Sequence, residues 1–137
     1  MVFIDSNILI YALIASQDSI KFSIAQKLLQ TNQNEITLSS QVILEVSVNL
    51  LRKGYFNEPQ IIKFIENSYQ DFTVIDVSKT ILISASQLRS NYAFSYFDSI
   101  IVAAALAANA TTLYSEDMQN GLVVNEQLTI VNPFAST

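Results

Sequence analysis

The sequence alternates short apolar, often β-branched runs with longer segments of helical periodicity, and this alternation constrains the fold most. The candidate strands are residues 2–5, 35–38, 72–77, 111–115 and 128–133. Strands that alternate with helices of about 10–15 residues favour a parallel sheet with helices packed on it. We therefore predict a single α/β domain over residues 1–137, with a short, mostly parallel central sheet of about four or five strands sandwiched by helices.

Capping signals mark the helices between these strands. The first two predicted helices are residues 6–14, which Ser6 or Asn7 is available to cap, and residues 19–31. A third runs from Ser39 or Ser40 to Gly54, and a fourth begins at Asn57 with Pro59 in its first turn. The last two run from Ser78 to about Tyr92 and from Ser95 to about Asn109.

The chain contains no cysteine and no histidine. Disulfides, thiolate zinc sites, imidazole metal ligands and cysteine or serine–histidine nucleophile systems are therefore excluded. Any chemistry must use carboxylates, hydroxyls, amides, Lys or Arg, together with a metal that prefers oxygen ligands if one is bound.

The net charge is −5, with 12 acidic and 7 basic residues. This balance argues against a general basic nucleic-acid-binding protein, which normally carries a positive patch. It does not exclude an enzyme whose carboxylates hold divalent cations, because those cations reverse the local field. Most bases suit solvated helix faces, and Arg52 and Lys53 suit a helix C-terminus or contact with substrate phosphates.

The N-terminal segment is apolar but lacks the basic region of a signal peptide, and Asp5 and Asn7 interrupt it. The longest uncharged apolar run, residues 100–108, has about half the length that spans a bilayer. We expect a soluble, cytoplasmic protein without a membrane segment.

Carboxylates follow the predicted strands at positions where parallel α/β sheets place their functional crevice. The acids in question are Asp5 after the first strand, Glu45 two turns into the next long helix, Asp98 in the first turn of a late helix, and Glu116 and Asp117 after the strand at 111–115. Each has a structural alternative: a helix cap for Asp5, a capping box with Ser95 for Asp98, turn residues for Glu116 and Asp117, and a surface position for Glu45.

The combination of these acids is more informative than any one of them. Carboxylates held within about 4–6 Å repel one another unless a cation lies among them. Oxygen-only ligation selects Mg²⁺ or Mn²⁺, and such an ion can polarise a phosphate oxygen and activate water. The pattern therefore indicates metal-dependent hydrolysis of a phosphodiester bond.

Four segments that carry these acids resemble the signature segments of PIN-domain ribonucleases, most of all VapC-like toxins of prokaryotic type II toxin–antitoxin systems. The segments are "FIDSNILIYA", "SSQVILEV", "YFDSIIVAAAL" and "LYSEDMQNG", and the resemblance covers essentially the whole chain. It implies a metal-dependent endoribonuclease with an RNA substrate, a cognate antitoxin as partner, and a homodimer.

The resemblance also implies roles for individual residues. It makes Asp5, Glu45, Asp98 and Asp117 the catalytic acids that hold one or two Mg²⁺ or Mn²⁺ ions. Asn7 and Ser115 match supporting polar positions. Glu116 is an additional acid, which either binds a second metal or only tunes the site.

Two questions stay open at the level of sequence. The aromatic residues between Tyr92 and Phe97 suit core packing, the rim of a cleft that stacks on bases, or a subunit interface. The alternative to an enzyme is a catalytically weak PIN-like module that binds RNA or protein, although its signature acids are intact.

Overall fold

A computed structural model of the chain describes residues 1–135. The helices are α1 (Ser6–Leu13), α2 (Ser19–Thr31), α3 (Ser40–Arg52), α4 (Glu58–Asp71), α5 (Lys79–Asn91) and α6 (Tyr96–Ala107). The strands are β1 (Val2–Ile4), β2 (Ile36–Ser39), β3 (Thr73–Ile75), β4 (Thr112–Tyr114), β5 (Val123–Val124) and β6 (Leu128–Val131).

The strands form one sheet in the order β3-β2-β1-β4-β6-β5. All neighbouring pairs are parallel except β5 and β6, which are antiparallel. The α/β class and the mostly parallel sheet are thus confirmed. The sheet has six strands rather than four or five, because the two-residue strand β5 pairs at its edge and is too short to give a sequence signal.

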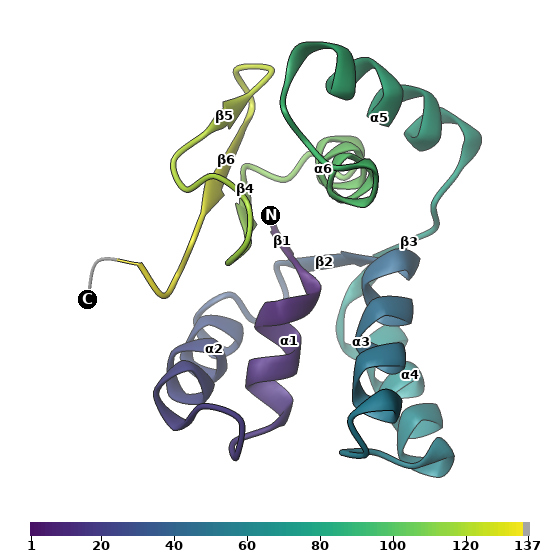
Figure 1. Cartoon of the computed structure of the whole chain (residues 1–137), viewed down its shortest axis with the longest axis vertical. Helices are drawn as coiled ribbons and strands as arrows, with labels where there is room; N and C mark the ends of the chain where they lie inside the picture. Colours follow the sequence, from purple (N-terminus) through teal and green to yellow (C-terminus); the bar gives the residue numbers. More distant parts are fainter. Residues whose placement is uncertain (136–137) are drawn as a thin grey trace.

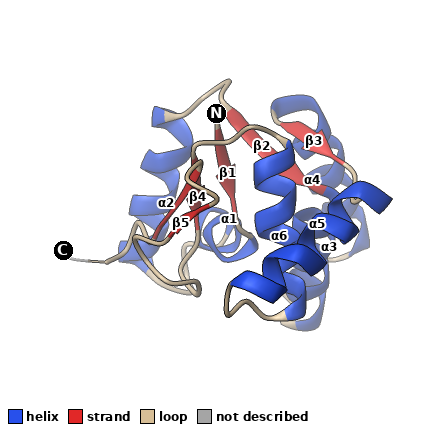
Figure 2. Ribbon diagram, turned by 90° about the horizontal axis from the view of Figure 1, so that it is seen from above, coloured by secondary structure: helices blue, strands red, loops and turns tan. Residues whose placement is uncertain are grey.

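Helices cover both faces of the sheet. In Figure 1, α1 to α4 lie on one side of β2 and β3, and α5 and α6 lie on the other; Figure 2 shows the strands side by side in the sheet. The chain builds outward from β1 to β2 and β3, then crosses back to β4 on the other side of β1. This reversal creates a topological switch point between β1 and β4, where open α/β sheets bind their ligands.

The central strands are buried on both faces, as parallel strands between helices must be. Phe3, Ile4, Leu38 and Leu113 lie in the core, and residues 99–105 of α6 are buried against it. The described part of the chain contains no helix that is long and apolar enough to cross a membrane.

Most predicted helix starts are confirmed by the capping contacts. Asn57 forms a reciprocal capping box with Gln60, and the Ser78 and Ser95 side chains accept hydrogen bonds from the first turns of α5 and α6. Ser39 caps α3, while the hydroxyl of Ser40 accepts a hydrogen bond from the Val77 N–H.

For the start of α1, the prediction of Ser6 or Asn7 as the cap was wrong, and the alternative role of Asp5 as a helix cap is confirmed. The N-cap of this helix is Asp5, not Ser6 or Asn7, and the Asp5 side chain accepts a hydrogen bond from the Ser6 N–H at 2.7 Å. A carboxylate at this position is favoured because it satisfies a free backbone N–H at the positive end of the helix dipole.

Candidate active site

Asp5 lies where β1 ends, at the switch point of the sheet. Its backbone N–H donates to the Tyr114 carbonyl of β4 at 3.0 Å, which extends the parallel ladder by one residue. One carboxylate oxygen, Oδ1, caps α1, and the other, Oδ2, accepts a hydrogen bond from the buried Ser115 hydroxyl at 2.8 Å. Asp5 therefore fixes the ends of two neighbouring strands and one helix.

Asp5 is only 6% exposed, and this burial dominates its ionisation. Desolvation raises the pKa of Asp5 to about 6, because the charged form loses its hydration. Hydrogen bonds from Ser115 and Ser6 act in the opposite direction, while the negative charges of Glu45 and Asp98 raise the pKa further. The fold thus buries the Asp5 carboxyl group in surroundings where its ionised form is unfavourable.

Glu45 reaches the same region from α3 and is half-buried. The Gln41 side chain, one turn earlier, donates to its carboxylate at 3.4 Å and also donates to the Phe97 carbonyl at 3.2 Å, which links α3 to α6. Desolvation raises the pKa of Glu45; hydrogen bonds from Gln41 and Ser6 lower it, and the charge of Asp98 raises it.

Asp98 occupies the first turn of α6, where its N–H donates to the Ser95 hydroxyl oxygen at 3.2 Å. Desolvation raises its pKa, a hydrogen bond with Ser95 lowers it, and the negative charge of Asp117 raises it again. Asp98 is therefore electrostatically coupled to carboxylates on both sides: Asp5 and Glu45 on one, Asp117 on the other.

Asp117 lies in the loop after β4 and is held by Asn7, whose side-chain amide donates to its Oδ2. Asn7 belongs to the first turn of α1, so this contact joins α1 to the loop that follows the neighbouring strand. The hydroxyl of Ser115 also accepts a hydrogen bond from the Met118 N–H at 3.4 Å, which shapes the same loop. Asn7 and Ser115 thus position Asp117 and Asp5, respectively.

We call Asp5, Glu45, Asp98 and Asp117 the acid cluster. Four oxygen-bearing carboxylates, supported by amides and hydroxyls, have the donor chemistry that Mg²⁺ and Mn²⁺ prefer. Within residues 1–135, however, no three acidic side chains are arranged so that they could hold a metal ion as they stand. Carboxylates that repel one another without a cation favour separation, and Asp117 is meanwhile bound to Asn7.

Two hollows flank the acid cluster. One, of about 330 Å³, is lined by Asp98 and Asp117 together with Tyr92, Phe94 and neighbouring residues. The other, of about 300 Å³, is lined by Glu45, Ser6 and Asn7 and by Arg52 at the end of α3. The acids therefore lie between two surface depressions.

The sequence and the structure were compared with known proteins. The sequence model of the PIN domain family matches residues 2–119, which include every member of the acid cluster. The chain belongs to the PIN domain family. A search of the curated proteins gave no match to this sequence.

Solved structures share the fold of this PIN domain at low sequence identity. A toxin–antitoxin complex from Klebsiella pneumoniae matches with a TM-score of 0.71 and 23% identity, over 98% of both chains. VapC20 of Mycobacterium tuberculosis, a sarcin–ricin loop cleaving toxin, matches with a TM-score of 0.71 and 15% identity, over 85% of this chain and 90% of that one. VapBC2 from Rickettsia felis, bound to a promoter DNA fragment, matches with a TM-score of 0.64 and 22% identity, over 96% and 100%.

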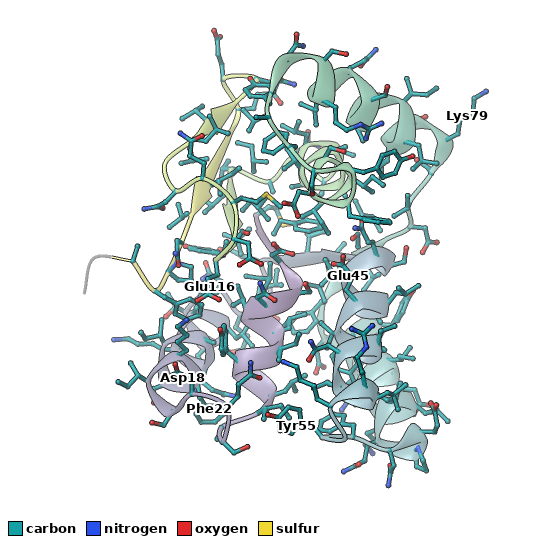
Figure 3. The ribbon with its side chains drawn as sticks, in the orientation of Figure 1. Asp18, Phe22, Glu45, Tyr55, Lys79 and Glu116 are labelled. Atoms are coloured by element: carbon teal, nitrogen blue, oxygen red, sulfur yellow. The ribbon has the colours of Figure 1, made fainter. Side chains whose placement is uncertain are left out.

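Glu116 of this PIN domain is bound outside the acid cluster. Its carboxylate accepts hydrogen bonds from the Tyr11 hydroxyl at 3.0 Å and from the Lys21 ammonium, which also forms an ion pair with it. Lys21 in turn lies 4.9 Å from the centroid of the Tyr11 ring and 5.4 Å from that of Phe134. In Figure 3, Glu116 and Glu45 lie on opposite sides of α1.

Sequence reasoning missed several residues that organise this site in the PIN domain. Ser6 was considered only as a cap, yet it hydrogen-bonds to both Asp5 and Glu45. Gln41 supports Glu45 from one helical turn away, a spacing that the sequence alone displays. Lys21 and Tyr11 bind Glu116 across the fold, and no local pattern signals that contact.

Proposed function

We propose that this PIN domain is a metal-dependent endoribonuclease that acts as the toxin of a toxin–antitoxin pair. The observation that carries the proposal is the convergence of four carboxylates at the switch point of the sheet, three of them with raised pKa values. Buried carboxylates that repel one another destabilise the folded state unless a cation binds among them.

In this proposal Asp5, Glu45, Asp98 and Asp117 would together hold Mg²⁺ or Mn²⁺. When bound, such an ion supplies Lewis acidity toward the phosphate and lowers the pKa of water. Ser115 and Ser6 orient the Asp5 carboxylate through its two oxygens. Asn7 holds Asp117 in reach, and Gln41 holds Glu45.

Arg52 supplies the positive charge that an anionic substrate needs in an acidic domain. It lies on α3 two turns beyond Glu45 and lines the hollow beside that acid. Two other bases are already used: Lys21 binds Glu116, and Arg89 donates to Ser99 and lies over the Tyr96 ring. We assign Arg52 to a substrate phosphate adjacent to the one that is cleaved.

An RNA substrate and an antitoxin partner are supported by two kinds of relatives of the fold. One is a sarcin–ricin loop cleaving toxin, and others are toxin–antitoxin complexes. A cytoplasmic location is consistent with this role.

We also propose a homodimer through the exposed apolar side chains of α3 and α6, chiefly Leu44, Tyr96 and Phe97. Sedimentation should show a dimer that Phe97→Glu dissociates; an unchanged dimer would place the interface elsewhere.

Cleavage of RNA by the purified protein tests the central proposal. Single-stranded RNA is incubated with wild-type protein in Mg²⁺ or Mn²⁺, in EDTA, and with the Asp5→Asn variant. We expect wild-type protein to cleave the RNA internally when metal is present, and neither wild-type protein in EDTA nor Asp5→Asn to do so. The matched control is Glu66→Gln, which changes an exposed acid on α4 and should cleave normally. Binding of RNA without metal-dependent cleavage would favour the alternative, a PIN-like binding module.

A further inference from the structure

The hollow beside Asp98 and Asp117 has an aromatic wall, and we call it the aromatic hollow. It is lined by Asn91, Tyr92, Ala93, Phe94, Asp98, Asp117, Met118, Gln119 and Leu122. Its volume of about 330 Å³ falls near the lower end of the range for small-molecule sites, about 300–1,000 Å³. A small group therefore suits it better than a bulky ligand.

The aromatic wall is held in place before any ligand binds. The Tyr92 hydroxyl accepts a hydrogen bond from the Asn125 N–H at 3.0 Å and donates to the Asn125 side-chain oxygen at 3.4 Å. These bonds fix the ring against the turn between β5 and β6. The Phe94 ring packs on Tyr92, with centroids 5.5 Å apart and an angle of 32° between the ring planes. Both rings are partly buried and packed against the hydrophobic core, so contacts within the protein hold them in place.

Apart from Asp98 and Asp117, which the proposed function assigns to the metal, the side chains that line the hollow are uncharged. Two carboxylates line the hollow, and no Lys or Arg among the described residues does so. The hollow therefore offers a phosphate no basic side chain, whereas an uncharged planar ring would stack on the aromatic wall. The exposed amides of Asn91 and Gln119 are able to donate to and accept from the edge of such a ring.

From this arrangement we infer that the aromatic hollow binds the nucleobase of one nucleotide next to the scissile phosphate. The inference rests on the proposed function, which places that phosphate at the acid cluster. Single-stranded RNA presents unstacked bases that proteins hold on aromatic side chains, whereas bases within a helix are already stacked. The site therefore selects substrates in which a base next to the cleavage point is free to turn outward.

Abasic scanning tests the inference. Wild-type protein and Phe94→Ala are assayed with Mn²⁺ on one cleavable single-stranded RNA oligonucleotide and on versions that each lack one base near the cleavage point. We expect wild-type kcat/KM to fall about 5- to 150-fold when the base at one flanking position is absent, the range for loss of one stacked base. Phe94→Ala should lower cleavage of the intact RNA by a similar factor and lose nothing further on that abasic RNA.

Two controls separate this effect from general damage to the protein. Tyr69→Ala removes an exposed aromatic side chain on α4 and should behave as wild type on every oligonucleotide. Phe94→Leu keeps most of the packing volume and should show the same loss of base dependence if Phe94→Ala folds poorly by circular dichroism. Tyr92→Phe keeps the ring but removes both bonds to Asn125, and should give a smaller loss.

The outcomes distinguish the inference from the proposed function. If wild-type protein cleaves the intact RNA and every abasic RNA equally well, the inference is wrong, but the proposed nuclease function is supported. If the Phe94 variants keep the full abasic sensitivity of wild type, the base binds elsewhere and the inference is again wrong. If wild-type protein cleaves no RNA with either metal, the proposed function fails and the inference fails with it.

Discussion

Two acidic residues that are adjacent in sequence, Glu116 and Asp117, lie in contrasting surroundings. Glu116 is neutralised by Lys21 and bonded to Tyr11, so its charge is satisfied within the protein. Among the described residues, the Asp117 side chain is bonded to the neutral Asn7 alone, and its charge raises the pKa of Asp98. Glu116 thus has a basic partner within the fold, whereas among the described residues no Lys or Arg forms an ion pair with the acid cluster.

The largest expected difference between the two regions is in RNA cleavage. Asp98→Asn should lower the rate by more than about 100-fold, because even residues that only support metal ligands often contribute 10- to 100-fold. Glu116→Gln should stay within a few-fold of wild type, since Glu116 binds Lys21 instead. Both rates are measured on the same RNA in Mn²⁺. Equal loss in the two variants would place Glu116 in the catalytic machinery.

The second expected difference is in the free energy of unfolding, which substitution of Asp5 and substitution of Glu116 should change in opposite directions. The pKa of Asp5 is about 6 in the folded protein against 3.8 in the unfolded chain, so the folded state binds more protons between these values. Stability of the metal-free protein should therefore fall as pH rises from about 4 to 6, by up to about 3 kcal/mol. Asp5→Asn should remove this loss and stabilise the metal-free protein at pH 7.

Glu116→Gln should instead destabilise the protein by about 1 kcal/mol or less, because it breaks a partly exposed ion pair. Urea denaturation of both variants at pH 4.5 and pH 7, in EDTA, gives the comparison. A wild-type protein whose stability does not change between these pH values would contradict the unfavourable burial of Asp5.

Metal binding should reverse the repulsion in the acid cluster. At Mn²⁺ concentrations near 100 times the dissociation constant, binding stabilises the folded state by about 2.7 kcal/mol, which corresponds to a rise of roughly 10 °C in Tm. The rise should be present in Glu116→Gln and absent in Asp5→Asn, as measured by calorimetry at pH 7. A rise of equal size in Asp5→Asn would show that the ion binds elsewhere.

The smallest expected effect concerns the substrate phosphate assigned to Arg52. Arg52→Gln should weaken RNA binding and reduce the slope of log K against log salt by about 0.7, the value for one phosphate contact on a single strand. Lys79→Gln is the matched control, because Lys79 lies at the start of α5, far from Glu45 (Figure 3). If the salt dependence of RNA binding has the same slope in both variants, Arg52 does not contact a substrate phosphate.

Much of this architecture could be predicted because its signals are local. Asn57, Ser78 and Ser95 cap helices through bonds to residues three positions away, so each start is visible in a short stretch of sequence. The approach of Asp5 to the loop after β4 followed from the rule that neighbouring parallel strands end at one edge. The roles of the acid cluster in metal binding and catalysis remain predictions.

What could not be predicted depends on contacts between distant parts of the chain. Lys21 and Glu116 are 95 positions apart, and neither position carries a pattern that pairs them. The sequence also presented helix capping and a role in the site as alternatives for Asp5, whereas in the structure one carboxylate oxygen caps α1 and the other accepts a hydrogen bond from Ser115. Side-chain hydrogen bonds of this kind depend on tertiary packing and produce no periodic pattern in the sequence.

Binding of Mn²⁺ by isothermal titration calorimetry at pH 7 tests the central claim most directly, because it measures the ion itself. We expect wild-type protein and Glu116→Gln to bind Mn²⁺ with the same stoichiometry, and Asp5→Asn and Asp98→Asn to lose that binding while staying folded. Wild-type protein that binds no Mn²⁺ at millimolar concentration, or an Asp98→Asn variant that binds it unchanged, would contradict the claim that the acid cluster is a metal site.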